Sequence, residues 1–258
     1  MNQNKLKDIT SQIVEKIRQA KSEGTYFAQP FQYCYIDNLL PEAFAKSIMD
    51  SFPPINSDSW ESPKDDGIEI KHRTTWQSEF DIPDGVLPII RILNSAPFLR
   101  AMAELFDIPK LIPDAYFAGG GLNITEKGGL LDVHVDGNYH DPTGLNRRIN
   151  AILYLNPGWE KGWGGEFGIY DNKGENLVDS IAPLFNRLVM FDTHDKSFHG
   201  LPEPLNFPEN QNRKSVILYY YTQASRTAET NTFGEPHSAL WVKKGIRDKK
   251  GNKSRPFS

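Results

Sequence analysis

The sequence predicts an α+β protein with a mainly β core, arranged as a sandwich or jelly-roll barrel and supported by N-terminal helices. Two patterns in successive segments of the 258 residues predict this fold class. Apolar residues recur every three or four positions in residues 1–111, whereas residues 112–225 hold short β-rich runs between Gly and Pro turns. Because this length suits a single core, we expect one domain with a polar C-terminal extension over residues 226–258.

Three segments of residues 1–111 have helical patterns. In residues 5–24 an apolar stripe precedes a stop at Gly24, and the stripe consists of Leu6, Ile9, Ile13 and Ile17. The second segment begins at Pro41 and ends at the proline pair of residues 53–54. The third covers residues 85–106 and is interrupted near residue 95, where Ser95 can cap its second piece.

The remaining segments divide into strands and polar connections. Residues 57–76 are polar and irregular, which predicts a loop or a hairpin over the main body. Strands are expected in the β-rich runs 115–125, 130–136, 148–156, 164–171, 187–192 and 214–222. The chain ends in VKKGIRDKKGNKSRPFS, with seven Lys or Arg against one Asp. This segment is expected to be a solvated tail or frayed terminus, with weak anion binding as the alternative.

The composition is that of an ordinary soluble protein, with 38% apolar and 24% charged residues. A net charge of −4 argues against a protein built mainly to hold nucleic acid. The single cysteine, Cys34, excludes an intramolecular disulfide and a cysteine-based zinc cluster, and it fits a reducing compartment. No apolar run approaches the roughly 20 residues of a membrane span, and the N-terminus lacks the apolar core of a secretory signal. We therefore expect a cytoplasmic protein.

The run LLDVHVD places a histidine and a carboxylate on one face of a predicted strand. Side chains alternate along a strand, so His134 and Asp136 point one way while Val133 and Val135 point the other. Burying such a pair is costly unless a group such as a divalent metal satisfies both, although an exposed H-x-D pair is also common. His199 follows the strand of residues 187–192 and would complete a 2-His-1-carboxylate triad, a ligand set that favours non-heme Fe(II).

Two choices remain open on spacing alone. His194, five positions before His199, is the competing metal ligand, and spacing favours His199 without deciding the matter. Arg213 begins a strand face that also holds Ser215, and its planar guanidinium suits a carboxylate. Lys214 is the competing anchor, because both faces of this strand are apolar. Tyr154, on the strand 148–156, can supply a phenol hydroxyl to the same carboxylate.

Taken together, six motifs resemble the prolyl 4-hydroxylase-like branch of the Fe(II)- and 2-oxoglutarate-dependent oxygenases. They are HVD at 134–136, AILYLN at 151–156, WGGEF at 163–167, RLVMFD at 187–192, FHG at 198–200 and R-x-S at 213–215. They cover roughly residues 115–222 in the expected order, and YIDNLLPEAFAKSI upstream resembles the helical lead-in of such proteins. The resemblance implies a double-stranded β-helix, which is a jelly roll, with the metal near its mouth.

The same resemblance implies roles for individual residues. His134, Asp136 and His199 would bind Fe(II), Arg213 would hold the distal carboxylate of 2-oxoglutarate, and Tyr154 would assist it. Relatives often place a tyrosine nine or ten residues before the first metal histidine. This sequence has Ile124 and Thr125 there, which puts the cosubstrate contacts at this edge in doubt.

The activity implied by the resemblance is hydroxylation of a substrate C–H bond with O2, releasing succinate and CO2, with ascorbate as a candidate reductant. Asp136 favours hydroxylation, because related halogenases have a small residue in its place. The resemblance favours peptidyl proline as the substrate. A free amino acid, a sugar or another small molecule is the alternative. Residues 57–80 and 137–148 are the expected entrance loops. The competing functions are a non-catalytic, cupin-like jelly-roll module and a zinc hydrolase, although no H-E-x-x-H motif appears.

Overall fold

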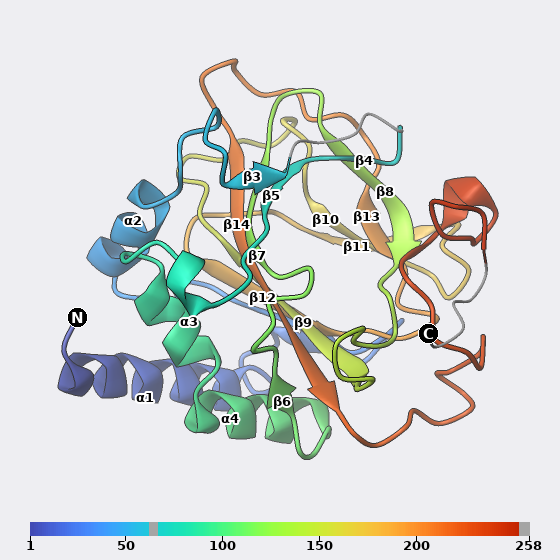
Figure 1. The fold of residues 1–258 in the computed structure, drawn as a ribbon, viewed down its shortest axis with the longest axis horizontal. Helices are drawn as coiled ribbons and strands as arrows, with labels where there is room; N and C mark the ends of the chain where they lie inside the picture. The colour runs from blue at the N-terminus through green and yellow to red at the C-terminus, as the bar shows by residue number, and fades with distance from the viewer. Residues whose placement is uncertain (62–66, 253–258) are drawn as a thin grey trace.

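The computed structural model describes residues 1–61 and 67–252, in which two antiparallel β-sheets face each other and helices cover the outer side of the larger sheet (Figure 1). The larger sheet has nine strands in the order β1-β2-β12-β9-β14-β7-β5-β3, with β6 paired to β14. The smaller sheet has six, in the order β11-β10-β13-β8-β15, with β4 paired to β8. This confirms the mainly β, jelly-roll type of α+β fold, although within the described residues the two sheets form no closed barrel.

The strands of the larger sheet come from both parts of the chain. They are β1 (Tyr26–Phe27), β2 (Tyr33–Ile36), β3 (Trp60–Glu61), β5 (His72–Thr74), β6 (Ile112–Pro113), β7 (Gly121–Thr125), β9 (Asn146–Tyr154), β12 (Arg187–Asp192) and β14 (Arg213–Thr222). Those of the smaller sheet are β4 (Glu69–Ile70), β8 (Leu130–Val135), β10 (Phe167–Tyr170), β11 (Leu177–Ile181), β13 (His199–Leu201) and β15 (Leu240–Trp241). The sheets therefore extend beyond the range 112–225 that the sequence predicts for the core.

The predicted helical segments are helices, with small differences at their ends. The four α-helices are α1 (Gln3–Gln19), α2 (Glu42–Asp50), α3 (Leu87–Leu93) and α4 (Ala96–Phe106). Helix α1 ends at Gln19, before the expected stop at Gly24, whose φ of +72° lies in the left-handed region that glycine tolerates. Ser95 occupies the N-cap position of α4, but its side chain makes no capping hydrogen bond. Two 3-10 turns, η1 (Glu79–Asp81) and η2 (Val242–Lys244), complete the helical elements.

The helices and the outer face of the nine-stranded sheet form the main hydrophobic core. Apolar positions that alternate along β9 and β14 point to this side, and they meet the apolar stripes of the four helices. Tyr220 on β14 also donates a hydrogen bond from its hydroxyl to the carbonyl of Leu93 in α3, at 3.0 Å. This packing commits one face of the larger sheet to structure and leaves the other face for the space between the two sheets.

The segment predicted as a loop or hairpin is a hairpin. Strand β3 pairs with β5 through Trp60 opposite Thr74, and residues 62–66 lie outside the described part of the chain. Strand β5 then pairs with β7 of the larger sheet, and β4 pairs with β8 of the smaller one. Residues 67–74 thus pass from the smaller sheet to the larger one (Figure 1).

The C-terminal extension of residues 226–258 is in part folded onto the smaller sheet, ahead of the predicted solvated tail of residues 242–258, most of whose described residues are exposed. Residues 240–241 form β15 on the edge of the smaller sheet, where Leu240 and Trp241 are buried. Further along, Lys249 forms an ion pair of 2.8 Å with Glu69. The last predicted tail residues, 253–258, lie outside the described part of the chain. Within the described ranges, no helix combines the length and the apolar composition that a membrane crossing needs.

Candidate metal centre

His134, Asp136 and His199 converge at the inner side of the smaller sheet. His134 lies near the end of β8, Asp136 directly follows this strand, and His199 begins β13, where it pairs with His134 across the sheet. Nε2 of His134 and of His199 lie 3.6 Å and 3.9 Å from Oδ1 of Asp136. One ligand atom from each residue lies within 4.8 Å of the other two, which is compatible with coordination of a single ion.

Hydrogen bonds fix which atoms of the triad face the common centre. Nδ1 of His134 lies 2.8 Å from the carbonyl of Asp132, and Nδ1 of His199 lies 2.9 Å from the carbonyl of Ser197. Because a carbonyl only accepts, each Nδ1 carries the proton and each Nε2 is left with a free lone pair. Asn150 donates to Oδ2 of Asp136 at 3.1 Å, so Oδ1 remains available. Such supporting bonds are typical of metal-binding histidines and carboxylates.

The charge state of the buried triad suits a bound cation. All three side chains are buried. Burial, together with the neighbouring His134, lowers the pKa of His199 to about 4, so its imidazole is neutral at pH 7. Burial opposes ionisation of Asp136, but its interactions with His134 and His199 outweigh burial and hold the pKa of this carboxyl far below its usual range. A buried carboxylate beside imidazole lone pairs is the donor set that suits Fe(II), and the residues therefore fit the metal that the sequence predicts.

Aromatic rings hold the two histidines in place and keep water away from them. Trp241 of β15 stacks on His134 with ring centroids 4.5 Å apart and an interplanar angle of 23°. Phe191 and Phe167 pack on His199 at 4.6 Å and 5.3 Å. The C-terminal extension thus contributes directly to the surroundings of the first histidine.

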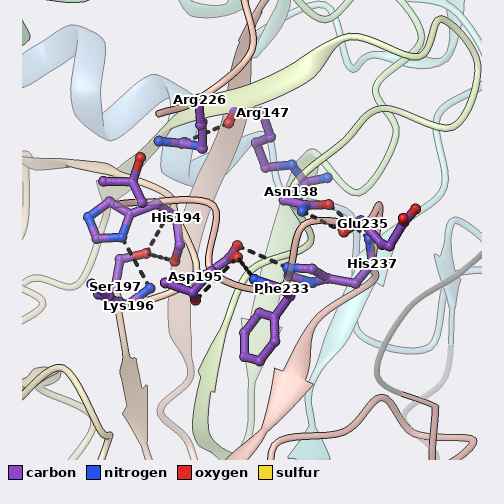
Figure 2. Close-up of polar contacts among 12 residues, drawn as sticks. Asn138, Arg147, His194, Asp195, Lys196, Ser197, Arg226, Phe233, Glu235 and His237 are labelled. Atoms are coloured by element: carbon purple, nitrogen blue, oxygen red, sulfur yellow. Dashed lines mark hydrogen bonds and ion pairs between the residues drawn. The ribbon is translucent and has the colours of Figure 1, made fainter. Parts of the chain in front are cut away.

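His194, the competing ligand, lies outside the triad. Its ring is edge-on to Phe31, its Nδ1 accepts a hydrogen bond from the backbone of Lys196, and its backbone N–H donates to Ser197 (Figure 2). Burial lowers its pKa to about 4. In residues 1–61 and 67–252, the only group of three ligand-type side chains whose ligand atoms lie within 4.8 Å of one another is the one that includes His199.

The three residues predicted to bind the cosubstrate line the same cavity as the triad. Arg213 is buried, its Nε donates to the carbonyl of Gly165 at 2.9 Å, and its Nη2 donates to the hydroxyl of Tyr154 at 3.2 Å. Burial raises the pKa of Tyr154 although Arg213 opposes this, so the phenol stays protonated. Ser215, also buried, lines the cavity, which has a volume of about 570 Å³ including its open mouth. No carboxylate of the described chain pairs with Arg213, and a buried guanidinium in this situation favours an anionic ligand.

The register of the larger sheet places Arg213, and not Lys214, on the cavity side. Ser215 is paired with Tyr154, and residues directly opposite each other share a face, so Arg213 and Ser215 lie on the cavity side. Lys214 points to the outer side, where its Nζ lies 5.4 Å from the centre of the Phe52 ring. Burial lowers the pKa of Lys214 from its ordinary value.

A second cavity adjoins the metal centre on the side away from Arg213. It shares Lys71, His134, Asp136 and Tyr219 with the first cavity, and its other walls come from residues 69–73, 118–119, 137–147 and 237–241. Arg147 forms part of this wall, with its guanidinium 3.9 Å from the centre of the Tyr219 ring. The predicted entrance loops 57–80 and 137–148 therefore both reach this opening, and the C-terminal extension forms a third wall that the sequence did not predict.

A buried contact between His237 and Asp195 attaches this C-terminal segment to the loops next to the predicted metal ligands. Nε2 of His237 lies 3.1 Å from Oδ1 of Asp195, and both side chains are almost fully buried (Figure 2). The backbone N–H of Phe233 donates to Oδ2 of Asp195 at 2.8 Å. Asn138, two residues after Asp136, accepts from the backbone of His237 at 2.8 Å and donates to the carbonyl of Glu235 at 3.0 Å. We call residues 226–241 the C-terminal clasp.

Replacing Asp195 with alanine is expected to lower the free energy of unfolding by about 3 kcal/mol, because His237 and the Phe233 amide lose their partner in a buried place. Urea denaturation of the purified protein measures this difference. The matched control is Glu209→Ala, which removes an exposed ion pair with Lys127 and should change stability by less than about 1 kcal/mol. Equal stability of the two variants would show that the clasp does not contribute to the fold.

Several residues of the site were not predicted from the sequence. Asn150 supports Asp136, Asn123 lines the cavity beside Ser215, and Trp241 stacks on His134. Alternation along β7 and β9 was a usable signal for the two asparagines, because they lie two positions from Thr125 and Ile152 on the same faces. No local signal exists for Trp241, which reaches the site only through the tertiary fold.

Comparisons with known proteins agree with this arrangement. A family model described as the 2OG-Fe(II) oxygenase superfamily matches residues 120–221. Prolyl 3-hydroxylase OGFOD1 of Mus musculus is 36% identical over 86 residues, which are 32% of this chain and 15% of that protein. Prolyl hydroxylase EGLN3 of Mus musculus is 29% identical over 101 residues, which are 39% of this chain and 38% of that protein. The chain thus matches well under half the length of these two relatives.

One solved structure shows the same fold over most of the chain. It is a prolyl hydroxylase from Trichoplax adhaerens, in complex with a peptide fragment of the hypoxia inducible factor oxygen degradation domain. It superposes with a TM-score of 0.55 and 17% identity, covering 86% of this chain and 94% of that chain. At this identity the match establishes the fold, in agreement with the two facing sheets described above.

Proposed function

We propose that this protein is an Fe(II)- and 2-oxoglutarate-dependent dioxygenase that hydroxylates a substrate C–H bond and releases succinate and CO2, because its residues 120–221 match the family model of the 2OG-Fe(II) oxygenase superfamily. One observation carries the proposal. A buried cluster of two imidazoles and a carboxylate shares a cavity with a buried guanidinium that has no carboxylate partner in the described chain. A metal and a dicarboxylate are the two ligands that satisfy both groups.

Each group of residues has a defined task in this reaction. Fe(II), when bound, supplies the reductive activation of O2 that hydroxylation requires. His134, Asp136 and His199 would hold the metal, and both cavities border this triad. Arg213, with Tyr154 and Ser215 beside it, would bind the distal carboxylate of 2-oxoglutarate and orient it toward the metal. Phe167, Phe191 and Trp241 exclude water from the histidines.

The second cavity is the proposed place of the substrate. It borders Asp136 and His134 directly, and its polar walls include Arg147, Tyr139 and His140. The relatives and the solved structure reported above are prolyl hydroxylases by name, and the solved one holds a peptide. We therefore propose a peptidyl prolyl residue as the first substrate class to test, ahead of free amino acids and sugars.

The test is purified protein with Fe(II), 2-oxoglutarate and ascorbate, followed for succinate release in the presence of proline-containing peptides, free proline and sugars. We expect peptide-stimulated succinate formation that disappears when Fe(II) is chelated. The non-catalytic jelly-roll alternative requires Arg213 and Tyr154 to be exposed or paired elsewhere, whereas both are buried in the cavity. Absence of both turnover and metal-dependent 2-oxoglutarate binding would support that alternative.

A further inference from the structure

The cavity that contains Arg213 also contains a buried amide whose donor has no partner. Asn123 lies in the middle of β7 and is 4% exposed. Its Nδ2 is buried and makes no hydrogen bond to any described residue. Buried donors in native proteins are nearly always satisfied, so an unsatisfied one that lines a cavity points to an acceptor supplied by a ligand.

The sheet register places Asn123 beside the predicted cosubstrate residues. Asn123 is paired with Ser215 of β14, and Ser215 is paired with Tyr154 of β9. Residues directly opposite each other share a face, so these three side chains form one row across the inner side of the sheet, and all three line the cavity with Arg213. Ile124, by contrast, is buried in the hydrophobic core on the outer side.

This row lies between the guanidinium and the metal centre. Along β14, the Arg213 position comes first, then the Ser215 row, then Ile217, and then Tyr219, which pairs with Asn150. Asn150 is the residue that holds Asp136. A ligand that extends from Arg213 to the metal therefore crosses the row that contains Asn123.

We propose that Asn123 is a cosubstrate-binding residue whose Nδ2 donates a hydrogen bond to a carboxylate oxygen of 2-oxoglutarate. The inference rests on the proposed function. A dicarboxylate offers acceptor oxygens only, which is the complement of an unpaired N–H. Both residues lie on β7, but Ile124 faces the hydrophobic core whereas Asn123 faces the cavity. Strand β7 therefore contributes to ligand binding through Asn123.

The test compares two variants of nearly the same size, Asn123→Leu and Asn123→Asp, in protein loaded with redox-inactive Mn(II). Isothermal titration calorimetry with 2-oxoglutarate is expected to show about tenfold weaker binding for Asn123→Leu, since a hydrogen bond to a charged group is lost. Asn123→Asp should bind still more weakly, because it places a carboxylate oxygen next to an incoming dianion. The affinity for Mn(II) itself should stay unchanged, because Asn150 and not Asn123 contacts Asp136.

A stability measurement separates binding from structure. Asn123→Leu removes an unpaired buried donor, so the ligand-free variant should be as stable in urea as the wild type or more stable. Asn123→Ala serves as a third variant if either replacement fails to fold. Unchanged 2-oxoglutarate affinity in the folded variants overturns the role of Asn123 alone. Failure of the wild-type protein to bind 2-oxoglutarate with Mn(II) overturns the proposed function, and the inference with it.

Discussion

Replacing Asp136 with alanine is expected to abolish iron-dependent succinate formation and to weaken divalent-metal binding by more than about 100-fold. Oδ1 of Asp136 lies within 3.9 Å of Nε2 of both His134 and His199, so it is close to both of the other predicted ligand atoms. Loss of a residue that merely orients a ligand already weakens metal binding roughly 10- to 100-fold, and loss of a ligand should exceed this range. Titration of the metal-free protein with Mn(II) measures the affinity without oxidation chemistry.

His194→Gln is the matched control for this prediction. His194 is buried in the same part of the chain as His199, and on spacing alone it was the competing ligand. Its ring packs on Phe31 and its Nδ1 is engaged by the backbone of Lys196, so the variant should keep the Mn(II) affinity of the wild type. If His194→Gln loses the metal, or if Asp136→Ala retains it, the assigned ligand set is wrong.

Local periodicity accounts for the part of the site that lies on one strand. His134 and Asp136 share a face because strand side chains alternate, and Val133 and Val135 indeed pack on the other side with Leu240. The pairing of His199 with His134 is a property of the tertiary fold, and no local pattern encodes it. The choice of His199 over His194 therefore depended on the order of motifs shared with a family, not on periodicity.

Alternation did not decide between Arg213 and Lys214, and the structure shows the physical reason. One face of β14 packs on the helices, and the other lines the space between the sheets, so apolar residues occur on both. The C-terminal clasp was missed for a different reason. Its polar residues, such as His237, form hydrogen bonds to distant loops, for example to Asp195. A polar composition alone instead predicts a solvated extension.

Arg213→Met is expected to weaken 2-oxoglutarate binding by about 100-fold or more, which corresponds to roughly 3 kcal/mol, while leaving Mn(II) affinity unchanged. Methionine keeps much of the length of the side chain and removes the only guanidinium that lines the cavity in the described chain. Arg213→Lys should lose about tenfold, because an ammonium keeps the charge but cannot bond to Gly165 and Tyr154 and also present a planar fork to a carboxylate. Calorimetry of 2-oxoglutarate with the Mn(II)-loaded variants gives both values.

Lys214→Met controls for the loss of a positive charge at the next position of the same strand. Its side chain lies on the outer face over Phe52, so 2-oxoglutarate affinity should equal that of the wild type. A comparable loss in both variants would mean that general electrostatic attraction, and not a contact in the cavity, draws the dicarboxylate to the protein. A loss confined to Arg213→Met, with the metal still bound, separates the anchor from the metal centre. In that case Arg213 and the triad act as independent contacts that line one cavity.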